Sequence, residues 1–216
     1  MALSNFSELK TSISSWLDED ALSLTVPDFI TLAEAEFNRK LRVLEMETRA
    51  TLDTVAGDDR YALPTGHLQT RRLTITTDSE RSLEYITPVE LVDLKPNSLT
   101  GEPAYFTIED AEIRLLPTPA SAYEMDQIYF KEITALSDSD PTNFLLTNHP
   151  DAYLYGSLVH AAPFLRDDER VAMWNAGYER AMEAIKKADI RRRFNSAPLR
   201  ARSEVTRDTW KVRKGP

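Results

Sequence analysis

The sequence predicts an α+β protein that is mainly helical, in which a helical bundle carries a small inserted antiparallel β-domain and ends in an extended basic tail. Three observations lead to this prediction. Apolar residues recur at helical spacing near both ends of the chain. The spacing becomes alternating between about residues 45 and 133, as in half-buried strands. Residues 186–216 hold 11 of the 26 basic residues but only 3 of the 35 acidic ones.

Two helices are predicted at the N-terminus. Asn5 stands three residues before Glu8, a spacing typical of a capped helix start. Thr25 is the expected cap of the second helix, and Pro27 and Asp28 suit its first turn. The apolar positions expected to pack together are Phe6, Leu9, Ile13, Trp16, Leu17, Ile30, Ala33, Phe37 and Leu41.

The middle of the chain predicts short strands separated by turns. Residues 105–108 and 127–130 are rich in the β-branched and aromatic types that favour strands. Glu109-Asp110, between two short strands, predicts a tight hairpin, and Pro88 to Leu94 predicts a short helix lying on the sheet.

Helical spacing returns near the C-terminus and predicts a helical hairpin. Its apolar positions are Leu154, Leu158, Ala161 and Leu165 after Asp151, then Val171, Trp174, Tyr178, Ala181 and Ile185 after Asp168. The pattern ends near Phe194. We therefore predict a helical bundle from residues 1–44 and 137–194, an inserted β-domain at 45–136 and an extended tail at 195–216.

Composition excludes several classes of protein. The 216 residues contain no cysteine, which excludes disulfide scaffolds, thiolate metal sites and cysteine nucleophiles. The net charge of −9 divides unevenly, because residues 1–185 carry −17 and residues 186–216 carry +8. No secretory signal is visible at the start, and the uncharged stretch 152–165 is too short and polar to cross a bilayer. We expect synthesis in the cytoplasm and no membrane partner.

No catalytic, metal-binding or cofactor-binding motif is recognisable, so we expect neither an enzyme nor a cofactor. His67 is expected in a solvated loop, His149 in a capping or packing role and His160 in a core. The acidic pairs are expected to form a solvated surface, because their spacing predicts coordination poorly. These pairs are Glu34/Glu36, Glu45/Glu47 and Asp138/Asp140.

The basic tail is the strongest candidate for a binding site. Arginines with occasional aromatic residues are typical of segments that bind nucleic acid phosphates or dock on an acidic protein surface. The tail could also be a disordered terminus that only increases solubility. Attraction to a membrane is a weaker alternative, because no amphipathic helix follows. The candidate partner-binding residues are Arg191, Arg192, Arg193, Arg200, Arg202, Arg207, Trp210, Lys211 and Arg213.

Four blocks of the chain carry a family resemblance. They are PDFITLAEAEFNRKLRVLEMETRA (27–50), YALPTGHLQTRRLTI (61–75), PAYFTIEDAEIRLLPTP (103–119) and NFLLTNHPDAYLYGSLVHAAPFLRDDERVAMWNAGYERAMEAI (143–185). Taken in this order, they resemble the head–tail adaptor proteins of short-tailed bacteriophages, also called head completion or portal-adaptor proteins. None of the blocks is a catalytic fingerprint.

The resemblance implies a structural virion protein at the head–tail junction. Such adaptors look like helical bundles with a β insertion, assembled as dodecameric rings beneath the portal. The expected partners are the portal protein, tail or nozzle proteins and other copies of the chain. Packaged DNA would pass through the channel without sequence-specific binding. From the distribution of charge, we further expect the basic tail to bind the portal.

Three alternatives remain open from the sequence. The chain could be a tail or nozzle ring component lower in the tail, or a nucleic-acid-binding module that acts through its basic tail. An enzyme such as a cell-wall hydrolase is disfavoured, because no motif nominates the two carboxylates that a glycosidase needs.

Overall fold

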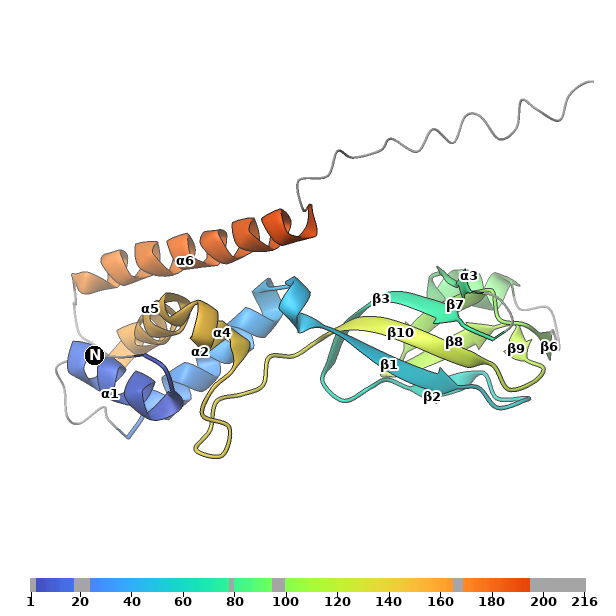
Figure 1. The fold of residues 1–216 in the computed structure, drawn as a ribbon, viewed down its shortest axis with the longest axis horizontal. Coiled ribbons are helices and arrows are strands. Elements are labelled where there is room, and N and C mark those ends of the chain that lie inside the picture. Colours follow the sequence, from blue (N-terminus) through green and yellow to red (C-terminus); the bar gives the residue numbers. More distant parts are fainter. Residues whose placement is uncertain (1–2, 18–23, 78–79, 95–99, 165–168, 195–216) are drawn as a thin grey trace, which may run out of the picture.

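The structure of the protein, a computed structural model, describes residues 3–17, 24–77, 80–94, 100–164 and 169–194. Most helices gather at one end of an elongated molecule and the strands at the other (Figure 1). The long helix α6 lies along the helical end, with its C-terminus toward the strands (Figure 1). The α-helices are α1 (Phe6–Leu17), α2 (Val26–Lys40), α3 (Pro88–Leu94), α4 (Phe144–Asn148), α5 (Pro150–Ala161) and α6 (Arg170–Arg193), with short 3-10 helices η2 (Leu44–Met46) and η3 (Ala162–Phe164).

The strands of the described residues form three sheets, in the orders β1-β10-β3-β4, β2-β8-β7-β5 and β6-β9. In the first sheet, β10 lies between β1 and β3 and is antiparallel to both. The strands are β1 (Glu47–Asp53), β2 (Arg60–Ala62), β3 (His67–Ile75), β4 (Arg81–Ser82), β5 (Glu84–Tyr85), β6 (Thr100–Gly101), β7 (Tyr105–Glu109), β8 (Glu112–Leu116), β9 (Thr118–Pro119) and β10 (Glu124–Lys131).

The predicted fold class is wrong. Of the described residues, 46% are helical and 26% lie in strands, so the protein is not a helical bundle with a small β insertion. The strand region is also not purely antiparallel, because β5 pairs with β7 and β6 with β9 in parallel. Four strands are only two residues long, too short to produce an alternating pattern, and three of them, β5, β6 and β9, pair with segments 18 or 21 residues away. The proposed division at residues 44, 136 and 194 stays a prediction.

Three local predictions are confirmed. α1 begins after Asn5, whose side-chain oxygen accepts the Glu8 backbone N–H at 2.9 Å. The short helix α3 spans the predicted residues, 88–94. β7 and β8 form the predicted hairpin, but its turn is Asp110-Ala111, with positive φ angles of 51° and 62°, one residue later than predicted because Glu109 still pairs with Glu112. Each of these features depends on residues close together in sequence, which is why local patterns could predict it.

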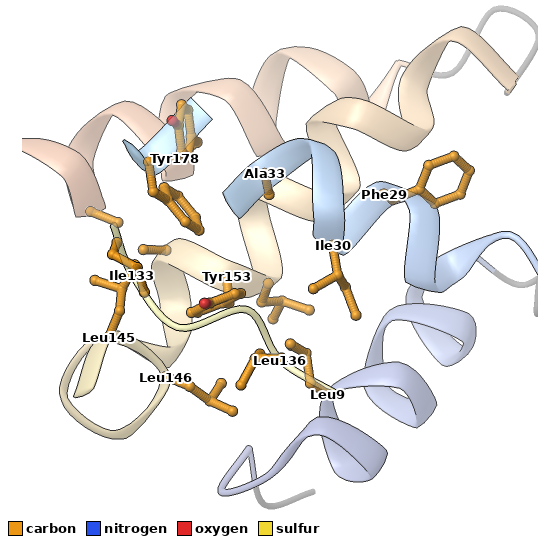
Figure 2. Close-up of a cluster of buried hydrophobic side chains, with 14 of the residues drawn as sticks. Leu9, Phe29, Ile30, Ala33, Ile133, Leu136, Leu145, Leu146, Tyr153 and Tyr178 are labelled. Atoms are coloured by element: carbon orange, nitrogen blue, oxygen red, sulfur yellow. The ribbon is translucent and has the colours of Figure 1, made fainter. Parts of the chain in front are cut away.

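One hydrophobic core joins the helices of the helical end. Figure 2 shows Leu136, from the segment after β10, beside Leu9, Leu146 and Tyr153. Trp174 of α6 is fully buried in the same core. The two predicted pairs of helices therefore share one core with the chain that returns from the strands.

α5 is the central helix of this core, because it packs against α1, α2, α4 and α6. A β-carbon at Gly156 of α5 would lie 3.2 Å from the Phe37 ring and 3.5 Å from the Ala33 β-carbon, so glycine permits the close approach of α2. The packing of α5 against α6 confirms the predicted helical hairpin. Leu165 and Asp168, which were assigned to this hairpin, lie outside the described residues.

The strand region has two smaller cores. The larger lies between the two four-stranded sheets, and the other lies beneath α3. Their buried members are Tyr61, Leu73, Ile75, Leu83, Phe106, Ile113, Leu115 and Met125 in the first, and Ile86, Leu91 and Leu116 in the second. Neither cluster approaches the extent of the helical core.

Candidate assembly interface

The C-terminal end of α6 meets the start of β1, and Arg193 is the central contact. Its Nε donates to Asp189 Oδ2 at 2.7 Å, and its Nη1 donates to Glu47 Oε1 at 3.2 Å. Its Nη2 donates to the backbone carbonyl of Arg42 at 3.3 Å. The guanidinium also lies 5.9 Å from the centre of the Phe130 ring. The planar fork of arginine thus holds α6 against both the helical end and the first sheet.

Neighbouring contacts extend this cluster. Asp189 Oδ1 accepts the backbone N–H of Leu44 at 2.7 Å, and Arg192 forms an ion pair with Glu45. These contacts join residues that lie about 145 positions apart in the sequence, so no local pattern could have revealed them. We call this cluster the α6 junction, and its charged members are Arg42, Glu45, Glu47, Asp189, Arg192 and Arg193.

The α6 junction determines where the chain leaves the helix. Ile185 is the last buried residue of α6, so the following two turns are held by charged contacts and not by the helical core. Three arginines in the last turn also suit the negative end of the helix dipole. The last turn of α6 therefore has a fixed position beside β1.

The candidate partner-binding residues divide into two groups. Arg191, Arg192 and Arg193 form the last turn of α6, where Arg191 is exposed and the other two contact the α6 junction. Binding of a partner by these three residues stays a prediction. Outside the described residues lie Arg200, Arg202, Arg207, Trp210, Lys211 and Arg213.

The histidines lie in three different environments. The prediction of a solvated loop is wrong for His67. This residue begins β3, its ring stacks on Tyr129, and its Nε2 lies 2.8 Å from the Thr70 hydroxyl. Burial lowers the pKa of His67 below its ordinary value. His149 separates α4 from α5, as expected for a helix entry. His160 is half-buried and lies 2.8 Å from Glu36.

A solvated surface was the wrong prediction for Glu34. This carboxylate is only 6% exposed and accepts the backbone N–H of Leu136 at 2.8 Å and the Tyr153 hydroxyl at 3.1 Å. Burial raises the pKa of Glu34, against the opposing effect of these two hydrogen bonds. For Glu36, burial also favours a higher pKa, but the adjacent Lys40 outweighs it and lowers the pKa. The two members of this pair therefore have structural partners.

Glu45 and Glu47 also have basic partners, whereas Asp138 and Asp140 are exposed, as predicted. Glu45 and Glu47 pair with α6, and Asp138 pairs with Lys10 at 3.1 Å while its own side chain stays 86% exposed. Within the described ranges, no group of three or more histidine, aspartate or glutamate side chains could hold a metal ion. Among the described residues, no helix is both long enough and apolar enough to cross a membrane.

Two comparisons with known proteins bear on this chain. A family model described as SU10 adaptor protein matches residues 4–202. A search of curated proteins finds no match. The family match covers all the described helices and strands, including the α6 junction.

Proposed function

Because the chain belongs to the SU10 adaptor protein family, a family of phage adaptors, we propose that it forms a head–tail adaptor ring beneath the portal of a virion. Membership makes the chain a structural component of the virion that contacts other head or tail proteins. In this ring, the chain would contact the portal on one side, tail or nozzle proteins on the other, and copies of itself around the ring.

The shape of the molecule supports assembly into a ring. Its helical and strand ends offer different surfaces (Figure 1). Contacts between two different surfaces of identical subunits are heterologous, and they close into a ring when the rotation permits. We propose a dodecamer, the number that the family resemblance implies. DNA would pass through the centre of this ring.

The distribution of charge supports separate roles for body and tail. Residues 1–185 carry a net charge of −17, and residues 186–216 carry +8. An acidic surface beside the channel forms few phosphate contacts and releases few counterions, so moving DNA would not adhere to it. The basic tail would bind acidic groups of the portal through charge-assisted hydrogen bonds.

The observation that carries the tail proposal is the anchoring of α6. Arg193 and Asp189 fix the last turn of the helix, so the tail begins at a defined point of each subunit. Residues 195–216 would extend over about 70 Å if fully stretched, which is ample to reach a neighbouring ring. Ordering each tail residue costs about 1–2 kcal/mol, so docking requires many contacts.

The test is binding of the chain to purified portal rings of the same phage, measured by co-sedimentation. The full chain should bind, and a chain that ends at Phe194 should fold equally well by circular dichroism but lose binding. A full-length variant with serine at the tail's basic positions separates charge from tail length, and it should also fail. Undiminished binding of the truncated chain would contradict the role of the tail.

The same preparations separate the alternatives. A tail or nozzle component would bind its tail neighbours but not the portal ring. A nucleic-acid-binding module would bind DNA with a strong dependence on salt concentration, and truncation at Phe194 would abolish that binding. Electron microscopy of the portal complex would give the number of subunits in the ring.

A further inference from the structure

One edge of the first sheet is only partly covered. β3 pairs with β10 from His67 to Ile75, but β4 covers its other edge only at Thr74 and Ile75. In the described part of the chain, no strand pairs with the outer edge of residues 67–72. Such an edge presents backbone N–H and C=O groups that an additional strand can pair with.

The second sheet leaves a similar edge opposite. The segment after β4 changes sheets: Leu83 still donates its N–H to the Leu73 carbonyl at 2.8 Å, and β5 then pairs with β7 at Tyr105 and Phe106. Residues 107–109 of β7 have no partner on that side among the strands that the structure describes. The two sheets therefore separate beside two uncovered edges.

A groove of about 510 Å³ lies along the uncovered edge of β3. Residues 67–72 line it on one side, and Phe106 and Ile108 of β7 line it on the other. Six residues of strand extend over about 20 Å, so the groove is suited to a short extended segment. Leu83 and Tyr85 add further apolar lining.

The groove is basic in an acidic protein. Its lining includes Arg71 and Arg72 but no aspartate or glutamate, although the whole chain carries −9. Arg71 forms an ion pair with Glu47, which lies at the α6 junction. Arg72 is exposed and forms no ion pair with any described residue. An incoming carboxylate beside Arg72 would therefore meet an uncompensated positive charge.

The same charges disfavour two other occupants. Two-fold pairing of residues 67–72 with the same edge of a second copy is antiparallel and sets Arg72 opposite His67 and Arg71 opposite Leu68, so neither arginine would gain an acidic partner. The chain's own tail, residues 195–216, holds six basic and two acidic residues and is mismatched to a basic groove. The complementary occupant is an acidic segment of a different protein.

We propose that the groove binds an extended acidic segment of another virion protein, which adds a strand to the uncovered edge of β3. Backbone hydrogen bonds to residues 67–72 provide the affinity, and alternate side chains provide the specificity. Apolar side chains of the segment pack on Leu83, Phe106 and Ile108, while a carboxylate pairs with Arg72. The inference rests on the proposed function only for the source of the segment.

The first test uses synthetic fluorescent peptides of about eight residues that alternate valine with glutamate, or valine with lysine. By fluorescence anisotropy, the acidic peptide should bind the full chain at least about tenfold more tightly than the basic one. Two N-methylated forms of the acidic peptide carry methyl groups on alternate sets of residues. Only one form should lose binding, because alternate N–H groups of a strand point to opposite edges.

The second test changes the charge of the groove. Arg72→Glu should weaken binding of the acidic peptide at least about tenfold, whereas Arg180→Glu, the same change on the exposed surface of α6, should leave it unaltered. Bound acidic peptide should slow hydrogen exchange at residues 67–72. Absence of binding, equal loss with both methylated forms or unaltered binding to Arg72→Glu would each overturn the proposal.

These outcomes are distinguishable from failure of the proposed function. The chain that ends at Phe194 keeps the groove, so it should bind the acidic peptide although it loses the portal ring. Arg72→Glu keeps the tail, so it should bind the portal ring although it loses the peptide.

Discussion

The helical and strand regions of this protein are stabilised in different ways. The helical end has one continuous core in which Trp174, Phe37 and Phe29 are almost completely buried. The strand region divides its buried residues between two small clusters and leaves edges of both four-stranded sheets uncovered in the part of the chain that is described. The helical end buries its apolar residues in one core, whereas the strand region leaves backbone groups that an additional strand could pair with.

The helical end buries one carboxylate, Glu34, with two hydrogen-bond donors from its own chain. Exposed ion pairs occur in both regions, such as Lys187 with Glu183 in α6 and Arg60 with Glu112 in the strands. Exposed pairs contribute little to stability, about 0–1 kcal/mol each. We therefore expect stability to be concentrated in the helical core, and the addition of a partner strand to occur in the strand region.

The largest expected effect tests this concentration with two matched leucines. Leu158 of the helical core and Leu73 of the strand core are both fully buried. Leu158→Ala should lower the free energy of unfolding by about 3–5 kcal/mol, because packed helices around it cannot collapse into the cavity. Leu73→Ala should cost about 2–3 kcal/mol, because its small cluster adjoins a groove and can relax.

Urea denaturation followed by circular dichroism measures both variants. A larger loss of unfolding free energy for Leu73→Ala than for Leu158→Ala would contradict the concentration of stability in the helical core. Two separate unfolding transitions, each affected by only one of the substitutions, would support the predicted division into a helical bundle and a β-domain.

The second prediction concerns the buried carboxylate. Glu34→Ala should cost about 2 kcal/mol, since it leaves the buried N–H of Leu136 and the hydroxyl of Tyr153 without their acceptor. Glu34→Gln keeps an acceptor oxygen and should be much less harmful. Equal losses in the two variants would show that the hydrogen bonds are not what stabilises this site.

The contribution of Glu34 to folding stability should also depend on pH. Burial raises the pKa of Glu34 above its ordinary value of 4.5, so the folded state holds this proton at pH values where the unfolded state has lost it. Stability from Glu34 should therefore decrease as pH rises from about 4.5 through the raised pKa. Glu34→Gln cannot titrate and should remove that decrease, which unfolding measured across this pH range would detect.

The sequence could predict features that depend on neighbouring residues, but not the burial of Glu34. The start of α1, α3 and the β7–β8 hairpin were predictable, because each depends on residues only a few positions apart, such as Asn5 and Glu8 or Asp110 and Ala111. Glu34 accepts a hydrogen bond from Leu136, which lies 102 positions away, so the spacing between Glu34 and Glu36 could not indicate that Glu34 is buried. The two-residue strands were not predicted because they are too short to show an alternating pattern, and β5, β6 and β9 pair with segments 18 or 21 residues away.

The third prediction concerns the link between the two regions. Arg193→Ala should reduce stability by about 1.5 kcal/mol, because it removes charge-assisted hydrogen bonds to Asp189 and Glu47 from a side chain that is 22% exposed. Arg191→Ala, at an exposed position of the same helix turn, is the matched control and should have almost no effect. Thermal unfolding of both variants would measure the difference, and equal effects would remove the structural role assigned to Arg193.

The candidate site shows the same limit of sequence-based prediction. The run Arg191-Arg192-Arg193 was visible as a basic cluster, and Asp189 lies four residues before Arg193, a spacing that permits a contact within one helix. Glu45 and Glu47 were visible only as an acidic pair, about 146 positions from their arginine partners. The sequence could identify the charges but not their pairing.

The smallest expected effect compares the two helix starts. Asn5→Ala should cost about 1 kcal/mol, because the Asn5 side chain accepts an N–H at the start of α1, which packs Leu9 and Ile13 into the helical core. Thr87→Ala removes the corresponding contact to Glu90 in α3, whose buried residue is Leu91. Its cost should stay below about 0.5 kcal/mol, because a short helix over a small cluster can open locally without unfolding the molecule. Urea denaturation of the two variants would test this order, and a greater loss for Thr87→Ala would mean that α3 is coupled to global stability as closely as α1 is.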